Sequence, residues 1–354
     1  MASHVRRVNL AHMYANMEPE PDDAELPTNT QFPQLNTREY NLRMNNPAES
    51  TAFQEFHECL DINEAGHVVV AINDYRSRFW VGHFWAYKDL QDFLEREKMP
   101  PNMQKPITRA PINVIKLFDD HLVFLGRATG TVEVWSLSSS MQECLVDYRN
   151  EHVGSVQEID FFSKTQAVSV DNEACIKIWD VNYMQARTSN TFRYAHGNAI
   201  TGVSVRPGSE DTFATVARDK SALLWDLRIM GKPASGLLQN HSEALMAISW
   251  ILEEEGSFVV KLGDAAGSVL TVDTRKPNEI VQEISAFQQS VKRIRRTKGK
   301  YAVCGHTNAF KVFQNNDQLL YEDSSSLDFV RDVAFHGNKV VSLSWDGKIV
   351  DKDV

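Results

Sequence analysis

Three side chains near the middle of the chain combine the residue types of a hydrolytic triad. They are His196, Thr215 and Asp219, and an imidazole between a hydroxyl and a carboxylate is the arrangement that activates a nucleophile. The same groups can instead form a buried structural network, in which every donor and acceptor is satisfied inside the protein and a turn is held against a strand. We favour the structural interpretation.

No other pattern in the sequence indicates catalysis. It contains no P-loop, HExxH, GxSxG or strand-linked GxGxxG motif, and its 11 histidines include no set at metal-ligand spacing. The four cysteines lie far apart without a CxxC pair, which is typical of reduced thiols in the cytosol or nucleus: Cys59, Cys144, Cys175 and Cys304. We therefore predict a protein that is not an enzyme and needs no cofactor and no metal.

The composition is that of an ordinary globular protein with acidic character. The 354 residues are 42% hydrophobic and 24% charged, with a net charge of −10. No apolar run approaches the roughly 18–20 residues of a membrane helix, and the N-terminus lacks the apolar stretch of a signal peptide. The negative charge disfavours binding to nucleic-acid phosphates and favours basic protein partners.

One hydrophobic pattern recurs along the chain: three apolar residues, separated first by two variable residues and then by one. Successive copies begin 44, 44, 45, 46 and 39 residues apart, which is the period of a β-propeller blade. The copies are Ile112-Ile115-Leu117, Val156-Ile159-Phe161, Ile200-Val203-Val205, Leu245-Ile248-Trp250, a partial Val291-Ile294 with Arg296 in the third slot, and Val330-Val333-Phe335.

A second marker keeps the same period. Each unit closes with a short apolar strand that often ends in an aromatic residue, and these closings fall near residues 85, 135, 179, 225, 272, 313 and 351. Seven closings predict seven four-stranded blades.

Within these units the residues resemble the WD-repeat family. Trp179-Asp180 and Trp225-Asp226 are the dipeptide of that family, and His152 and His196 lie where it places its Gly-His signal. The resemblance implies that His196, Thr215, Asp219 and Trp225 form its buried tetrad. In the third unit Ser169 and Glu173 occupy the threonine and aspartate slots, and in the fifth Ala266 occupies the aspartate slot. The predicted fold is an all-β, seven-bladed WD40 β-propeller.

The last blade lacks its outer strand, because residue 354 follows its third strand directly. An open edge invites aggregation, so we expect the N-terminal residues 39–43 to supply that strand and close the ring. Residues 1–35 are acidic and contain several prolines, which predicts a disordered tail before a propeller of residues 36–354. Residues 94–111 are expected to form a long surface loop.

A closer resemblance is carried by residues 77–89, in which Trp80 and Trp85 lie five residues apart before a Lys-Asp pair. Together with residues 39–42, 165–169, 232–235 and 328–332, this stretch is similar to the methylosome WD-repeat protein family (the methylosome protein 50 family). The resemblance implies a non-catalytic adaptor of protein arginine methyltransferase 5 in a hetero-octamer with four of each chain. It also implies presentation of Arg- and Gly-rich substrates, such as histone and Sm-protein tails, in the cytoplasm and nucleus.

In that family a first-blade tryptophan inserts into the N-terminal barrel domain of the methyltransferase. The resemblance places this role on Trp80, flanked by Arg78, Phe79 and Tyr75. The alternative is that Trp80 begins a strand and packs between blades.

Two further features keep other functions open. Residues 292–300 form a basic run in which Lys292, Arg293, Arg295 and Arg296 could bind an acidic partner or nucleic acid, although solvated charges at a rim are the commoner outcome. The tetrapeptide ending at Arg228 fits the WDxR box of substrate receptors of cullin-RING ubiquitin ligases, which is the alternative function.

Overall fold

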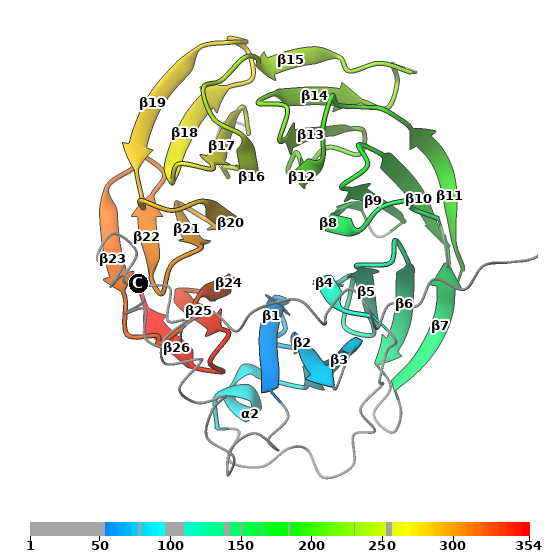
Figure 1. Ribbon diagram of the computed structural model, residues 1–354, viewed down its shortest axis with the longest axis vertical. Helices are drawn as coiled ribbons and strands as arrows, with labels where there is room; N and C mark the ends of the chain where they lie inside the picture. Colours follow the sequence, from blue (N-terminus) through cyan, green and yellow to red (C-terminus); the bar gives the residue numbers. More distant parts are fainter. Residues whose placement is uncertain are drawn as a thin grey trace, which may run out of the picture. The chain divides into compact units, whose positions relative to one another are not determined.

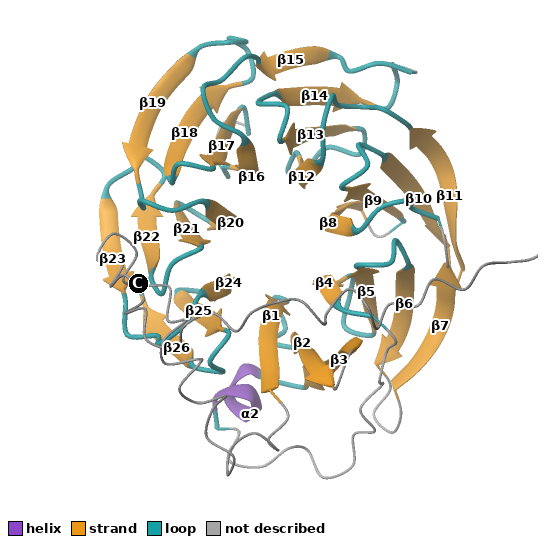
Figure 2. Ribbon diagram, viewed as in Figure 1, coloured by secondary structure: helices purple, strands orange, loops and turns teal. Residues whose placement is uncertain are grey.

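The strands of the molecule follow one another as seven antiparallel sheets around a ring (Figure 1). The structure is a computed structural model that describes residues 54–76, 79–95, 110–137, 142–148, 151–163, 165–182, 185–229, 231–252 and 257–354. Apart from one short helix, the regular elements of the described residues are all strands (Figure 2). The predicted seven-bladed, all-β propeller is confirmed.

In the described part of the chain, blades one to three contain eleven strands. They are β1 (Gln54–Ile62), β2 (Val68–Arg76) and β3 (Phe79–Tyr87); β4 (Ile112–Leu117), β5 (Leu122–Arg127), β6 (Val132–Leu137) and β7 (Gln142–Tyr148); and β8 (Val156–Ser163), β9 (Gln166–Asp171), β10 (Ile176–Asn182) and β11 (Gln185–Phe192).

The other fifteen strands of the described residues belong to blades four to seven. They are β12 (Ile200–Val205), β13 (Thr212–Ala217), β14 (Ala222–Asp226) and β15 (Ser235–Leu238); β16 (Leu245–Trp250), β17 (Val259–Asp264), β18 (Ser268–Asp273) and β19 (Ile280–Ser285); β20 (Val291–Thr297), β21 (Lys300–Gly305), β22 (Phe310–Gln314) and β23 (Leu319–Asp323); and β24 (Val330–His336), β25 (Lys339–Ser344) and β26 (Ile349–Asp353).

The innermost strand of every blade carries a β-bulge at the same place. Each pairing with the second strand shifts register just after the first residue of the recurring apolar pattern, for example between Ile200 and Gly202. A regular strand would bury residues i, i+2 and i+4, but the extra residue of the bulge turns this spacing into i, i+3 and i+5. The bulge is therefore the physical cause of the repeat seen in the sequence.

The same bulge identifies the first blade, which has no copy of the apolar pattern. Its register shift lies between His57 and Cys59, so the three slots are occupied by His57, Leu60 and Ile62. Because the first slot holds a histidine instead of an aliphatic residue, the sequence pattern alone misses this strand.

The hydrophobic core is divided into seven clusters, and each cluster fills the space between two neighbouring blades. Trp225, for example, packs with blade-three residues such as Phe192, their ring centroids 5.2 Å apart. A single blade is thus covered only by its neighbours, so closure of the ring is what buries the facing sides of the first and last blades.

Blades one and seven meet to close the ring. Leu60 and Trp85 of blade one share a cluster with Ala334 and Leu343 of blade seven. The helix α2 (Leu90–Leu94) adds Leu90 and Phe93 to that cluster, and Asp89 caps its N-terminus by accepting a hydrogen bond from Asp92 N. No helix of the described residues is long and apolar enough to cross a membrane.

Blades one and seven each show three strands in the described part of the chain. Residues 39–43, which we expect to complete blade seven, and residues 1–35 lie outside the described residues, as does most of the predicted loop at 94–111. The closing strand, the tail and the domain boundary near residue 35 therefore stay predictions.

Candidate functional site

The triad-like set in blade four is a continuous series of hydrogen bonds. His196 lies just before β12, and its Nε2 is 2.7 Å from the Thr215 hydroxyl, while its Nδ1 is 3.0 Å from Asp219 Oδ2. The indole N–H of Trp225 donates to the same hydroxyl at 2.8 Å. Thr215 is fully buried, so the hydroxyl is held between two partners inside the blade. This geometry is that of a structural network, as the resemblance implied.

The carboxylate of this network links folding to pH. Burial alone would raise the pKa of Asp219, but hydrogen bonds from His196 and Ser221 lower it to about 2. Its contribution to stability is therefore present above the ordinary aspartate pKa of about 4 and is lost as the pH falls through 2. We expect Asp219→Asn to lower stability at pH 7 and to flatten the acid limb between pH 4 and 2, measured by urea unfolding across pH. An unchanged acid limb would contradict this assignment.

Blade three contains the same chain with a different acid. His152 Nε2 lies 2.6 Å from the Ser169 hydroxyl, to which Trp179 donates at 2.8 Å. The carboxylate on His152 Nδ1, at 2.9 Å, belongs to Asp171 at the end of β9. The assignment of this slot to Glu173 is therefore wrong, because the acid comes from the strand instead of from the turn after it.

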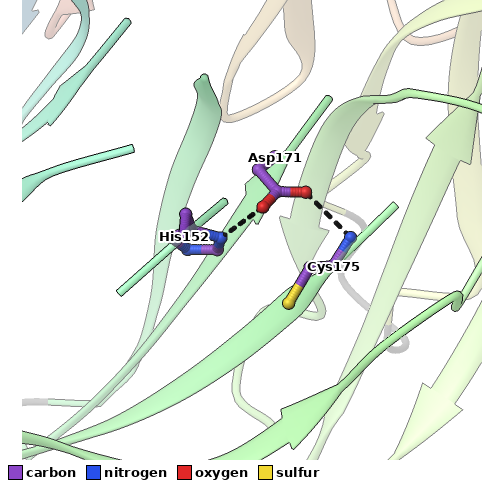
Figure 3. Close-up of side chains that lie close together, drawn as sticks. All are labelled: His152, Asp171 and Cys175. Atoms are coloured by element: carbon purple, nitrogen blue, oxygen red, sulfur yellow. Dashed lines mark hydrogen bonds and ion pairs between the residues drawn. The ribbon is translucent and has the colours of Figure 1, made fainter. Parts of the chain in front are cut away.

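Cys175 lies beside this pair, so that His152, Asp171 and Cys175 bring a nitrogen, an oxygen and a sulfur within 4.8 Å of one another (Figure 3). Their bonds do not suit a metal ion. Asp171 already accepts the ring of His152 and the backbone N–H groups of Glu173 and Cys175. Burial, together with the charge of Asp171, raises the pKa of Cys175 to about 11, which makes the loss of the thiol proton on metal binding more costly. We interpret the set as structural.

Blades two and five keep variants of the network that the sequence did not reveal. In blade five His241 Nε2 lies 3.3 Å from Asp264, at the strand end that corresponds to Asp171. Ala266 therefore does not leave the blade without its acid. In blade two Glu133 accepts the indole N–H of Trp135 at 2.9 Å and forms a buried ion pair with Arg127.

Trp80 lies on β3 with 44% of its surface exposed, the largest exposed aromatic of blade one in the described residues. Its ring centroid is 5.4 Å from that of Phe56, and Phe56 in turn lies 5.5 Å from Trp345. Trp345 continues to Phe329 at 5.6 Å. We call Trp80, Phe56, Trp345 and Phe329 the aromatic row; it runs across blades one and seven.

The residues predicted to flank Trp80 at the interface are described only in part. Arg78 and the side chains of Tyr75 and Phe79 lie outside what the structure describes, and only the backbone of β2 and β3 places Tyr75 opposite Trp80.

The basic run occupies β20, the inner strand of blade six, and its charges meet carboxylates across the ring. Arg293 is buried and forms an ion pair with Glu158 of blade three. Arg295 bonds to Asp332 of blade seven at 3.1 Å.

Lys292 lies 3.7 Å from Glu58 of blade one, which also accepts from Arg331 at 2.6 Å. Burial first, and then the charge of Arg331, lower the pKa of Lys292 to about 8. These matched charges argue against a free basic surface on Lys292, Arg293 and Arg295.

Arg296 differs from its neighbours in the basic run, because it donates to a backbone carbonyl, that of Trp250 at 3.2 Å, and not to a carboxylate.

Arg228 of the WDxR box is exposed and forms ion pairs with Asp226 at 2.6 Å and with Asp211 at 3.0 Å.

Seven blades, interblade cores and His-hydroxyl-acid-Trp networks define a WD-repeat β-propeller, a scaffold class that acts through its surfaces. No protein-family model matches the chain. It is 24% identical to Protein valois of Drosophila melanogaster over 286 residues, covering 76% of each chain. It is also 24% identical to Methylosome protein WDR77 of Xenopus laevis over 302 residues, covering 80% of this chain and 85% of the relative.

A more distant match and a solved structure agree with the fold. The chain is 25% identical to Nuclear distribution protein PAC1 of Candida tropicalis over 108 residues, 30% of this chain and 21% of the relative. A chain in the crystal structure of the mitotic checkpoint complex superposes with a TM-score of 0.66 at 14% identity, covering 84% of this chain and 90% of the other. The predicted resemblance to the methylosome WD-repeat proteins is confirmed as a similarity over about four fifths of the chain.

Proposed function

We propose that this chain is the adaptor subunit of a protein arginine methyltransferase 5 complex and that Trp80 is its anchor. The similarity to the methylosome protein over four fifths of the chain supports the partner. The observation that carries the anchor is the exposure of Trp80, 44% in a residue type that is highly buried on average.

The surroundings of Trp80 suit an interface. Phe56 of β1 contacts the ring of Trp80 and is itself packed against Trp345 of blade seven, which restricts the side chain of Trp80 before binding. Tryptophan is enriched among residues that dominate binding free energy when they enter a partner pocket. The partner in this proposal is the N-terminal barrel domain of the methyltransferase.

The remaining roles rest on the same proposal. A rigid propeller of net charge −10 would raise the local concentration of cationic, Arg-rich tails, such as those of histones and Sm proteins, near the methyltransferase. The proposed assembly is a hetero-octamer with four of each chain, present in cytoplasm and nucleus.

We expect Trp80→Ala to weaken methyltransferase binding by about 2 kcal/mol or more, roughly 30-fold in Kd. The measurement is co-expression with the cognate methyltransferase, size-exclusion chromatography with light scattering, and titration of the purified chains. Leu319→Ala is the matched control, because Leu319 is 47% exposed on the outer strand β23 and lies outside the aromatic row.

Three outcomes are informative, provided that both variants melt like the wild type. A large complex that only Trp80→Ala weakens supports the adaptor and the anchor. A complex whose affinity is unchanged by Trp80→Ala supports the adaptor role but rejects Trp80 as the anchor. Absence of any complex rejects the proposal and favours a ubiquitin-ligase receptor, for which Arg228→Ala would then abolish ligase-adaptor binding.

A further inference from the structure

A cavity of about 170 Å³ lies at the centre of the ring, lined by the inner strands of all seven blades. Among its polar groups are Lys116, Asp160, Ser204, Ser249, Arg295 and Arg296. Lys116 and Arg295 are 14% and 17% exposed, so the cavity is reached by solvent. At about 30 Å³ for a water molecule in the liquid, it has room for roughly five.

The charges that line this cavity are paired within 4.0 Å, with two exceptions in the described residues, the cation Arg296 and the carboxylate Asp160. Lys116 lies 3.7 Å from Asp61, and Arg295 is paired with Asp332 behind the wall and with Glu158 at 3.5 Å. Arg296 has no carboxylate within 4.0 Å among the described residues, and its hydrogen bond goes to the neutral carbonyl of Trp250.

The nearest acid to Arg296 is engaged elsewhere. Asp160 accepts the backbone N–H of Phe161 at 2.9 Å and that of Val205 at 2.7 Å. It attracts Arg296 without reaching ion-pair distance. A guanidinium has five N–H donors in a planar fork, and one described hydrogen bond to a carbonyl leaves most of the fork directed at the solvent of the cavity.

The position of Arg296 makes this unusual. It occupies the third slot of the inner-strand pattern, where the other blades have Ile62, Leu117, Phe161, Val205, Trp250 and Phe335. Burial lowers the pKa of Arg296, and Asp160 offsets this only in part. Burying a cation in an apolar slot costs desolvation free energy. A bound anion would offset this cost.

We propose that the central cavity binds a small oxyanion, held by the guanidinium of Arg296. Arginine forks bind phosphate and carboxylate groups through two parallel hydrogen bonds. The cavity has room for a small anion such as inorganic phosphate, sulfate or a short dicarboxylate. The hydroxyl of Ser249 on the adjacent blade five already donates to the Trp250 carbonyl at 3.3 Å. The hydroxyl of Ser204 on blade four accepts the Trp250 N–H at 3.3 Å and keeps its own proton for a further hydrogen bond.

The acids of the wall set where the anion lies. Asp61 and Glu158 line the far side and are each countered by a cation, Lys116 for the first and Arg293 with Arg295 for the second. Asp160 attracts Arg296 and accepts the backbone N–H of Val205 of blade four, so it disfavours an anion against blade four. The anion therefore lies on the blade-five side of Arg296, where Ser249 is found.

The test is calorimetric titration of the purified chain with inorganic phosphate, sulfate and succinate, each against sodium chloride at equal ionic strength. The variants are Arg296→Gln, which keeps a donor for the Trp250 carbonyl but removes the charge, and Arg296→Lys, which keeps the charge but not the fork. Arg228→Gln is the control, since Arg228 is 73% exposed on the outer part of blade four.

We expect saturable binding of at least one anion by the wild type and Arg228→Gln, weakened at least tenfold in Arg296→Gln and less in Arg296→Lys. Binding of phosphate or sulfate would identify a tetrahedral ligand, and binding of succinate a carboxylate. Absence of saturable binding by the wild type, or equal affinity in Arg296→Gln, would overturn the proposal. If the variants do not fold, a melting temperature of the wild type that rises saturably with the anion but not with chloride supports it, and equal effects refute it.

Discussion

Asp332→Asn is expected to lower the free energy of unfolding by about 3–5 kcal/mol, the cost of breaking a buried ion pair by removing one partner. Asp332 is fully buried on β24, where Arg295 donates to both its oxygens at 3.2 and 3.1 Å. Its Oδ2 also accepts the backbone N–H of Leu60 at 3.3 Å. An asparagine would turn an NH₂ group toward one of these donors and leave the charge of Arg295 without its main partner.

The pH dependence of the variant provides a second readout. Burial favours the neutral acid, but the charges of Arg295 and Arg293 outweigh it and lower the pKa of Asp332. Its stabilisation is therefore present above about pH 4 and is lost as the pH falls through the lowered pKa. Urea unfolding at pH 7 and below pH 4 should show a large difference between variant and wild type at pH 7 that shrinks in acid.

Asp351→Asn is the matched control for Asp332→Asn. Asp351 is 42% exposed on β26 and lies 3.1 Å from Lys339, and exposed pairs contribute about 0–1 kcal/mol. Equal losses for the two variants would show that the central ion pairs add no more to stability than surface pairs do.

Asp317→Asn is expected to have a similarly large effect, about 3–5 kcal/mol, for the same reason. Asp317 forms an ion pair with Lys261, which has no exposed surface, and also accepts the hydroxyl of Tyr301. The ammonium of Lys261 additionally lies 2.6 Å from the Thr271 hydroxyl and 5.0 Å from the centre of the Tyr301 ring. Asparagine tolerates the φ of +69° at this position. The loss of unfolding free energy would therefore come from removal of the charge and not from backbone strain.

The double variant Lys261→Met/Asp317→Asn separates the charge from the packing. It removes both charges of the pair, and we expect it to recover most of the stability lost in Asp317→Asn. The coupling energy in the double-mutant cycle is then about 3 kcal/mol or more, at the upper end of measured values. Glu322→Gln, in the exposed pair with Lys311 at 3.4 Å, is the control. Additive losses for Lys261 and Asp317 would contradict a coupled pair.

Local sequence patterns were sufficient for the architecture. The inner-strand pattern and the strand closings repeat at blade length because the same bulge in every inner strand directs the same three positions into the core. The resemblance to WD repeats was sufficient to group His196, Thr215, Asp219 and Trp225, because all four lie within one blade and their separations are set by two hairpins. The blade whose first slot holds His57 escaped this pattern, since its packing is kept with a different residue type.

The charge network was decided only by the closed ring. Arg293 and Glu158 are 135 residues apart, and Arg331 and Glu58 are 273 apart, yet each pair meets because the inner strands of all blades face one centre. No local pattern reports such a contact, so a run of basic residues on β20 reads as a free surface until its distant carboxylates are in place. The same closure leaves Arg296 as the cation without a carboxylate partner in the described wall of the cavity. Only the closed ring shows this, because the side chains that could pair with Arg296 come from six other blades.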